Sequence, residues 1–192
     1  YKTVSDDPLR MLRCIRFASK LGFGIEENTL EAIKRIHGEI GIITKERILT
    51  ELNKIISSPN PFGGFMLLHE TGLLHDIIPE LSDLDDSGEE GKHHKNTLIH
   101  SFKVLDQVAE KTDNINLRWA ALFHDIGKLK TGVWTEETGW TFHHHEEVGE
   151  KMTKEILGRL RMPKKSIEYI TRLVRLHMRP SLMITGEVTD SG

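Results

Sequence analysis

The strongest constraint on this chain is an apolar helical stretch that ends on two polar, ligand-type residues, His124 and Asp125. Leu117, Ala120 and Ala121 recur with His124 at the spacing of one helix face, which places His124 on the side that faces the core. Buried polar groups without partners cost free energy, so such a pair needs partners from elsewhere in the fold. Sequence alone therefore predicts a helix that packs against other elements carrying polar side chains.

Three further histidines, His100, His145 and His177, stand on separate predicted helices or turns that can bring them to this pair. A single histidine on a core-facing stripe is usually a hydrogen-bonded core residue. Several imidazoles with one carboxylate instead suit a borderline divalent metal such as zinc, nickel, cobalt, manganese or iron. Gly127 is predicted to stop the helix, and Lys128 follows at its end.

These residues resemble the motif set of the HD superfamily of metal-dependent phosphohydrolases, over about the last hundred residues of the chain. The resemblance implies that the metal ligands are the following residues: His100, His124, Asp125, His145 and His177. It also implies that Asp125 can bridge two metals and that a later Asp completes the first site. Asp190 lies in a polar terminal stretch, so the HD domain is expected to be truncated there and the first site to lack one ligand.

The resemblance implies hydrolysis of a phosphoester, such as a phosphomonoester or a 2′,3′-cyclic phosphodiester at a damaged tRNA 3′ end. A metal lowers the pKa of bound water and supplies a nucleophile near neutral pH. His124, Asp125 and Lys128 form the expected catalytic set, with Lys128 or Arg179 steadying the phosphate.

The N-terminal residues 5–23 are predicted to form a capped amphipathic helix. Ser5 or Asp6 can cap it, and Pro8 fits the first turn. Gly22 and Gly24 are expected to end it. Its inward-facing residues are predicted to be Leu9, Leu12, Ile15, Phe17, Ala18 and Leu21, while Arg10, Arg13 and Arg16 form a basic stripe. For such a stripe on any helix, a solvated charged face is the ordinary interpretation.

Asp7 and Arg10 nevertheless resemble the acidic-Asp-x-x-Arg motif of class II tRNA nucleotidyltransferases, the CCA-adding enzymes and their bacterial poly(A) polymerase relatives. The resemblance implies that this pair presents a template to the incoming base. The carboxylate accepts from an exocyclic amine and the guanidinium donates to a ring nitrogen or carbonyl, which suits both CTP and ATP. Arg13 is included in the expected nucleotide site, and the tRNA 3′ end is the expected RNA partner.

Arg47 and Glu51 match the Arg-x-x-x-Glu element of the same family. Four-residue spacing predicts an ion pair along one helix, whose other face carries apolar residues. Structural support is the expected role of this pair, and direct nucleotide contact is the alternative.

The predicted fold class is all-α, with one small β-hairpin near residues 133–142. Residues 1–85 are predicted to form a helical neck and body segment that binds RNA and nucleotide, and residues 86–192 the HD domain. In the family that this order resembles, a catalytic palm with magnesium-binding carboxylates precedes the first helix. The chain is therefore expected to be a piece of a longer protein and not to transfer nucleotides alone.

Charge and cysteine content set further limits. Residues 61–92 hold one basic residue against eight acidic ones, although the net charge of the whole chain is only −3. The acidic stretch 80–91 is expected to be an exposed inter-domain loop, so RNA contact relies on local basic patches. Cys14 is the only cysteine, which excludes an internal disulfide. No signal peptide or membrane-length apolar run is apparent, and we expect a cytoplasmic protein that does not contact membranes.

The chain contains other histidines that tempt a metal assignment. His75 and Asp76 repeat the His-Asp pair without the helical stripe, so we expect only a local packing role for them. His37 and His69 are expected to be structural, and His143 and His144 to face solvent or to support the ligands. His93 and His94 precede His100, and His94 is expected either to contact phosphate, to support the ligands or, less readily, to bind the metal.

Three functional interpretations remain open on sequence. The HD domain is a working phosphohydrolase attached to a tRNA-tail enzyme, or it is a tRNA-binding body with little chemistry. The third interpretation is a free-standing nucleotide phosphohydrolase, which leaves the Asp7–Arg10 and Arg47–Glu51 motifs unexplained.

Overall fold

The computed structural model describes residues 7–85 and 96–178. Within them the chain is helical apart from one two-stranded antiparallel hairpin, which confirms the predicted all-α class and the hairpin near residues 133–142. The elements of the first described stretch are α2 (Leu9–Leu21), α3 (Glu27–Ile36), the 3-10 helix η1 (His37–Ile42), α4 (Lys45–Ile56), α5 (Pro61–Glu70), α6 (Leu73–Ile77) and α7 (Pro79–Ser82). Those of the second are α8 (Thr97–Lys111), α9 (Ile115–Phe123), α10 (Lys128–Thr131), β1 (Val133–Thr135), β2 (Gly139–Thr141), α11 (His145–Arg159) and α12 (Lys164–Leu176).

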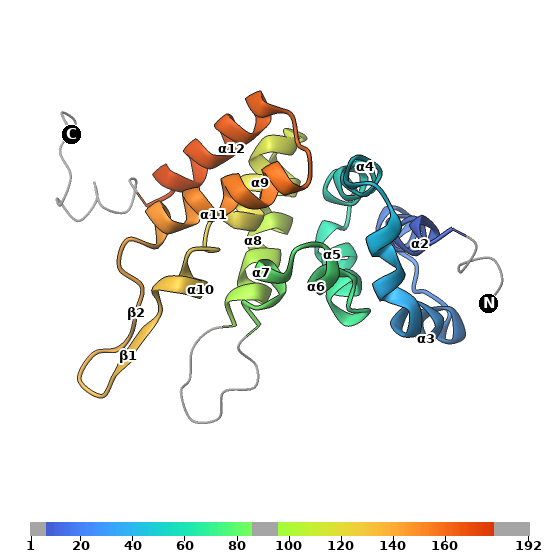
Figure 1. Ribbon diagram of the computed structural model, residues 1–192, viewed down its shortest axis with the longest axis horizontal. Helices are drawn as coiled ribbons and strands as arrows, with labels where there is room; N and C mark the ends of the chain where they lie inside the picture. The colour runs from blue at the N-terminus through green and yellow to red at the C-terminus, as the bar shows by residue number, and fades with distance from the viewer. Residues whose placement is uncertain (1–6, 86–95, 179–192) are drawn as a thin grey trace.

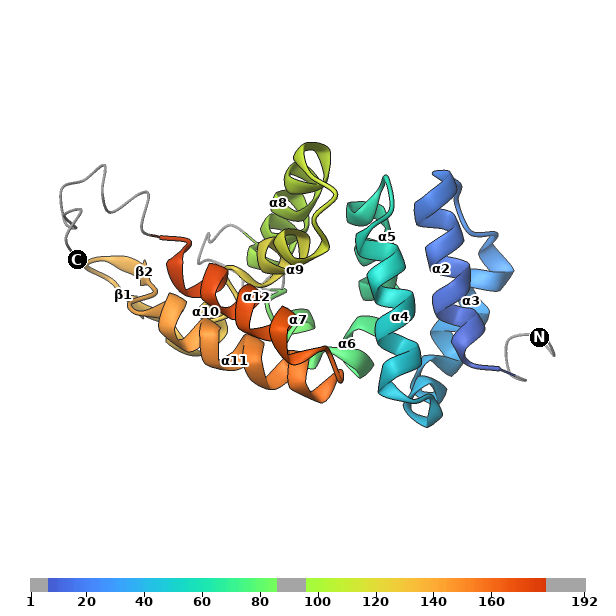
Figure 2. The same ribbon diagram turned by 90° about the horizontal axis from the view of Figure 1, so that it is seen from above.

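The helices form an elongated body whose two ends hold the two groups of predicted functional residues (Figures 1 and 2). Helices α2 to α5 lie at one end, where α2 packs against both α4 and α5. At the other end, α11 packs against α12, and α9 packs against both α8 and α12. Contact between α5 and α8 joins the two ends.

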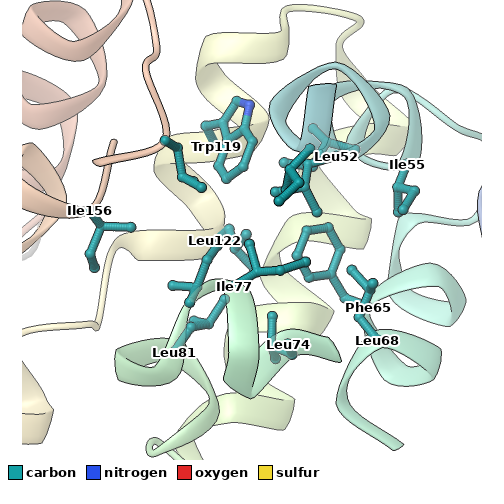
Figure 3. Packing of buried hydrophobic residues seen from close by; sticks show 14 of the residues in the cluster. Leu52, Ile55, Phe65, Leu68, Leu74, Ile77, Leu81, Trp119, Leu122 and Ile156 are labelled. Carbon is teal, nitrogen blue, oxygen red and sulfur yellow. The ribbon is translucent and has the colours of Figure 1, made fainter. Parts of the chain in front are cut away.

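One cluster of buried hydrophobic residues extends through both ends of the molecule. Figure 3 shows its middle, where side chains of α4 and α5 meet those of α6, α7, α9 and α11. The side chains labelled there are Leu52, Ile55, Phe65, Leu68, Leu74, Ile77, Leu81, Trp119, Leu122 and Ile156. Because of this shared burial, residues 7–85 and residues 96–178 pack as one unit, since neither part can expose its share of the cluster without losing hydrophobic free energy.

Helix α2 follows the predicted pattern only in part. Leu9, Leu12 and Ile15 are buried as expected, but Phe17 is 49% exposed and Leu21 is 55% exposed. Helix geometry explains the error, because each residue turns by about 100° and Leu21 therefore lies opposite Leu12. Asp7 caps the helix by accepting a hydrogen bond from the Leu9 amide. The predicted caps at positions 5 and 6 lie outside the described residues.

The predicted exposed loop at 80–91 is wrong for its first residues. Helix α7 covers 79–82, and Leu81 and Leu84 are buried in the core. Two apolar residues three positions apart supply a buried face despite the surrounding acids. The two terminal guanidinium nitrogens of Arg159, at the end of α11, donate to the carboxylate of Glu80, each over 2.7 Å. Residues 86–91 lie outside the described parts of the chain.

A buried arginine, which the sequence analysis did not single out, ties the two ends together. Arg118 in the first turn of α9 is only 4% exposed. Its guanidinium donates to the carbonyl of Ile56 at the end of α4 over 2.8 Å and to that of Ala109 in α8 over 3.0 Å. The Nε–H donates to the Thr112 carbonyl over 2.9 Å. Arginine thus satisfies carbonyls that the helix ends leave without internal partners.

Replacing Arg118 with Met is expected to lower the free energy of unfolding by about 3 kcal/mol, because several buried carbonyls lose their donor. Urea unfolding monitored by circular dichroism measures the change. Arg172→Met on the exposed face of α12 is the matched control and should stay within about 0.5 kcal/mol of the wild type. Equal stability of the two variants would contradict the structural role of Arg118.

Candidate metal centre

The centre of the site is Asp125, a carboxylate that is only 3% exposed. Four imidazole Nε2 atoms approach its two oxygens: His124 at 3.2 Å, His145 at 3.4 Å, His100 at 3.8 Å and His177 at 3.9 Å. The structure therefore brings all the predicted ligands together. Two overlapping groups of residues fit a metal ion, His100 with His124 and Asp125, and Asp125 with His145 and His177.

Each of these histidines stands at a helix end. His100 lies in the first turn of α8, whose cap Asn96 accepts a hydrogen bond from the Ile99 amide. His124 follows the last residue of α9, His145 begins α11, and His177 follows the last residue of α12. Because these helices pack on one another, their ends meet at one place.

Three of the imidazoles are oriented by the backbone. The Nδ1 atom of His124 lies 2.7 Å from the Ala121 carbonyl oxygen, and that of His177 lies 2.7 Å from the Val174 oxygen. His145 makes the same contact with Phe142 over 2.9 Å. A carbonyl only accepts, so each Nδ1 carries the proton and each Nε2 is left to face Asp125. Histidines that bind metals are held in this way, so the donor set fits a divalent metal.

The protonation of the site follows from these contacts. Burial alone would raise the pKa of Asp125, but hydrogen bonds from His124 and His145 and nearby positive charge hold that pKa far below its usual range. A hydrogen bond with Asp125 raises the pKa of His145, against the opposing effect of burial. Burial lowers the pKa of His177. Asp125 is therefore ionised and His177 neutral near pH 7, as metal ligands need to be.

The imidazoles of His145 and His177 are close enough for their Nε2 atoms to share a proton or a cation. The Nε2 atoms of His145 and His177 lie 3.2 Å apart, and both face Asp125. Two nitrogen lone pairs at this distance repel each other unless a proton or a metal ion lies nearby. A metal ion bound here would have to displace a proton from His145, whose pKa is raised by its hydrogen bond with Asp125.

Gly127 has a different role from the predicted one. Its backbone is in the right-handed helical region, with φ −64° and ψ −20°, so it is not a left-handed helix stop. A Cβ at this position would overlap the carbonyl oxygen of His145 and lie 2.7 Å from the Gly149 amide nitrogen. Gly127 is thus required for the close approach between the turn after α9 and helix α11, which sets the distance from Asp125 to His145.

Lys128 belongs to the same cluster. Its Nζ donates to the Asp125 Oδ2 atom over 2.8 Å and lies 5.3 Å from the centre of the Phe142 ring. The lysine therefore places a positive charge beside the candidate ligands. Arg179, the other residue predicted to steady a phosphate, lies outside the described residues, as do His93, His94 and Asp190.

The second set of predicted residues lies at the other end of the molecule, between α2 and α4. Asp7 lies 3.9 Å from Arg13 and 3.8 Å from Arg47, measured between carboxylate oxygens and guanidinium nitrogens. The buried Glu51 contacts Arg13 at 3.7 Å and Arg16 at 3.4 Å. Arg10 is exposed on the same helix. Asp7 and Arg13 of the expected nucleotide site are thus neighbours.

The predicted ion pair between Arg47 and Glu51 is wrong. Glu51 turns toward α2, where it meets two arginines, and the half-exposed Arg47 reaches the cap residue Asp7 instead. An arginine that precedes a glutamate by four residues is the less favourable order within a helix, so contacts with the neighbouring helix prevail. Through these separate contacts Arg47 and Glu51 still link α4 to α2 and the residue before it, in keeping with a structural role. The signal missed in the sequence was Arg16, whose position on the buried side of α2 calls for an acidic partner.

The other histidines have local partners or face solvent. His37 pairs with Asp76, and His69 pairs with Asp85 at 2.9 Å, which gives both histidines the structural role expected of them, although as partnered residues. His75 is exposed. His143 and His144 are exposed as predicted. The exposed His144 also forms a group with the half-buried Glu146 and Glu147, but Arg175 already neutralises both glutamates.

Comparisons with known proteins find two family matches, one in each half of the chain. Residues 22–84 match the family model described as the probable RNA and SrmB-binding site of polymerase A, and residues 97–190 match that of the HD domain. HD domains generally bind divalent metals. The chain is 35% identical over 181 residues to a multifunctional CCA protein of Alcanivorax borkumensis, covering 90% of this chain and 43% of that protein. The chain belongs to the family of the CCA-adding tRNA nucleotidyltransferases.

Other members of these tRNA nucleotidyltransferases differ in what they add. A CC-adding enzyme of Thermus thermophilus is 38% identical, and an A-adding enzyme of Deinococcus radiodurans is 33% identical, each over 90% of this chain and 42% of the relative. The chain thus spans less than half of the length of these relatives.

Solved structures agree on the fold. A complex of a CCA-adding enzyme with ATP superposes with a TM-score of 0.57 at 20% identity, over 96% of this chain and 39% of that one. A complex with CTP gives a TM-score of 0.52 at 20% identity, over 94% of this chain and 37% of that one. Within residues 7–85 and 96–178, no helix is both long and apolar enough to cross a membrane.

Gly127→Ala is expected to weaken Ni²⁺ binding at least tenfold and to lower the free energy of unfolding by about 2–3 kcal/mol, because the added methyl forces α11 and its His145 away from Asp125. Calorimetric titration and thermal unfolding measure the two effects. Gly158→Ala, in the same helix α11 with nothing within 4 Å of the added carbon, is the control and should keep full Ni²⁺ affinity. Unchanged Ni²⁺ affinity in Gly127→Ala would show that this approach does not position the ligands.

Proposed function

We propose that the HD centre binds a divalent transition metal and hydrolyses a phosphoester at an RNA 3′ end, a phosphomonoester or a 2′,3′-cyclic phosphodiester. The observation that carries the proposal is the convergence of the His100, His124, His145 and His177 Nε2 atoms on the buried Asp125. A metal ion held by these residues would act as a Lewis acid on water and on the phosphoryl group. Nickel, manganese, cobalt, iron and zinc all suit this donor set.

The residues of the site have three separate roles: they orient the ligands, hold the metal and supply positive charge for the phosphate. The carbonyls of Ala121, Phe142 and Val174 hold three imidazoles in one orientation, so little reorganisation is needed when the ligands engage. Asp125 belongs to both candidate groups and can therefore serve two ions. Lys128 supplies a positive charge for the non-bridging oxygens of a phosphate.

The proposal fits a role in preparing RNA ends. A tail-adding enzyme needs a free 3′ hydroxyl, so a neighbouring phosphatase would prepare blocked ends for extension. We propose that the chain works within a tRNA nucleotidyltransferase of the cytoplasm whose palm domain binds magnesium, with the tRNA 3′ end, CTP and ATP as partners. The family assignment and the adjacent RNA-binding family match support this role.

Metal-loaded protein is expected to hydrolyse 2′,3′-cyclic AMP in the presence of Ni²⁺, Mn²⁺ or Co²⁺. His124→Ala and Asp125→Ala should each lower kcat/KM on the order of a hundredfold, because each removes a candidate ligand. His143→Ala, an exposed histidine two residues before His145, is the matched control and should retain activity. No hydrolysis by the wild type with tRNA binding intact would instead support a tRNA-binding body without this chemistry.

At the other end of the molecule, we propose that Asp7 and Arg10 select the incoming base and that Arg13 holds Asp7 in place. The Asp7 carboxylate caps α2 with one oxygen and lies near two arginines with the other, which fixes its position at the helix start. A carboxylate and a guanidinium one turn apart can pair with the amine and ring nitrogen that CTP and ATP share.

In a nucleotidyltransferase that carries this chain after its palm domain, Arg10→Ala is expected to reduce the preference for CTP and ATP over UTP and GTP about tenfold. Losing one partner of such a pair costs about 1–3 kcal/mol of discrimination. Incorporation of each nucleotide into a tRNA lacking its 3′ end measures the preference. Arg35→Ala on the exposed face of α3 is the control. Unchanged selectivity in Arg10→Ala would return the arginine to an ordinary solvated position.

A further inference from the structure

Three aromatic side chains form a row on one face of the β1–β2 hairpin. Trp134 and Trp140 are directly paired across the strands, with ring centres 6.0 Å apart. Phe142 follows Trp140 by two positions and lies one residue beyond the end of β2. Its ring lies 6.0 Å from that of Trp140, with the two planes only 10° apart.

This row ends at the candidate metal centre. The Lys128 ammonium group lies 5.3 Å from the centre of the Phe142 ring and 2.8 Å from Asp125. The Phe142 carbonyl also accepts the Nδ1–H of His145. The aromatic row, the lysine and the ligands are thus successive members of one chain of contacts.

The far end of the row is open to solvent. Trp134 is 40% exposed, and all three residues of β1 are exposed. Figure 1 shows the hairpin extending away from the helices beside α10. Cross-strand contact between the two indoles helps to hold a hairpin that would be marginal alone. That structural role requires neither the exposed outer ring nor the alignment of the row with Lys128.

The two ends of the aromatic row lie near charges of opposite sign. Glu136 and Glu137 occupy the exposed turn at the outer end, whereas Lys128 and Lys130 lie on α10 at the inner end. Phosphate groups are repelled at the outer end and attracted at the inner end. An anionic ligand that stacks on the rings is therefore directed with its phosphate toward Lys128.

We propose that this aromatic row stacks the last unpaired bases of an RNA 3′ end and directs the terminal phosphate to Lys128 and the metal centre. The substrate class is then a single-stranded polynucleotide end rather than a free mononucleotide. Recognition by stacking tolerates every base, because each base offers a flat π face. This inference rests on the proposed phosphohydrolase function for its chemical purpose, but the binding that it requires is measurable without hydrolysis.

The first test measures binding alone. An RNA pentanucleotide with a 5′ fluorescein and a 3′ phosphate is titrated with the protein without added metal. Fluorescence anisotropy gives the dissociation constant. Trp134→Ala is expected to weaken binding about tenfold, as for the loss of one stacked base. Trp134→Phe should restore most of the affinity, because it keeps an aromatic face.

Val133→Ala is the matched control, since Val133 is an exposed neighbour on the other face of the same strand and is expected to keep full affinity. Thermal unfolding of each variant confirms that the hairpin change leaves the helical body folded. Equal affinity of Trp134→Ala and Val133→Ala would overturn the proposal and leave the indoles as a cross-strand pair. A strong preference for one base sequence would also contradict recognition by stacking.

The second test uses hydrolysis and separates this inference from the proposed function. Trp134→Ala is expected to raise KM about tenfold for an oligonucleotide that ends in a 2′,3′-cyclic phosphate, with a clearly smaller effect on 2′,3′-cyclic AMP. Equal loss on both substrates would overturn the inference while the phosphohydrolase function stands. If the wild type hydrolysed neither substrate, the proposed function would be refuted. The anisotropy measurement would still show whether the aromatic row binds the oligonucleotide.

Discussion

The burial of the Asp125 carboxylate among four imidazoles is the interaction on which the C-terminal half of the structure depends. A buried carboxylate is costly unless opposite charge or hydrogen-bond donors surround it. Here the donors come from the ends of α8, α9, α11 and α12, so the helices must converge for the charge to be tolerated. Gly127 permits the close approach of α11, the helix that carries His145. The same convergence creates the donor set that fits a metal.

Helix α9 connects this centre to the rest of the molecule. Its first turn carries Arg118, which binds carbonyls of α4 and α8, and its last residue leads directly into His124 and Asp125. Beside Arg118, the Trp119 indole donates to the Asn53 side chain of α4 over 2.8 Å. The residues proposed to bind nucleotide, at the start of α2, and the cluster around Asp125 are therefore held in one packed body, because α2 packs on α4.

The convergence of the four histidines on Asp125 could be predicted from the sequence, because these residues lie in short motifs whose order and local helical setting are visible along the chain. What it could not predict depends on contacts between helices. Arg118 looks like any helical arginine until the carbonyls of α4 and α8 are placed beside it. Glu51 looks like a partner for Arg47 until α2 brings Arg13 and Arg16 closer. Gly127 resembles a helix stop, although its small size serves the packing of α11.

Imidazole nitrogen NMR can show whether the Nε2 atoms around Asp125 are ligands of one metal centre. Addition of one equivalent of Zn²⁺ should shift the Nε2 resonances of His124, His145 and His177, with His100 affected as well. The resonances of His37 and His69, which pair with Asp76 and Asp85 outside the cluster around Asp125, should not shift. Zn²⁺ that shifts only the exposed His143 and His144, or no histidine at all, would contradict the account.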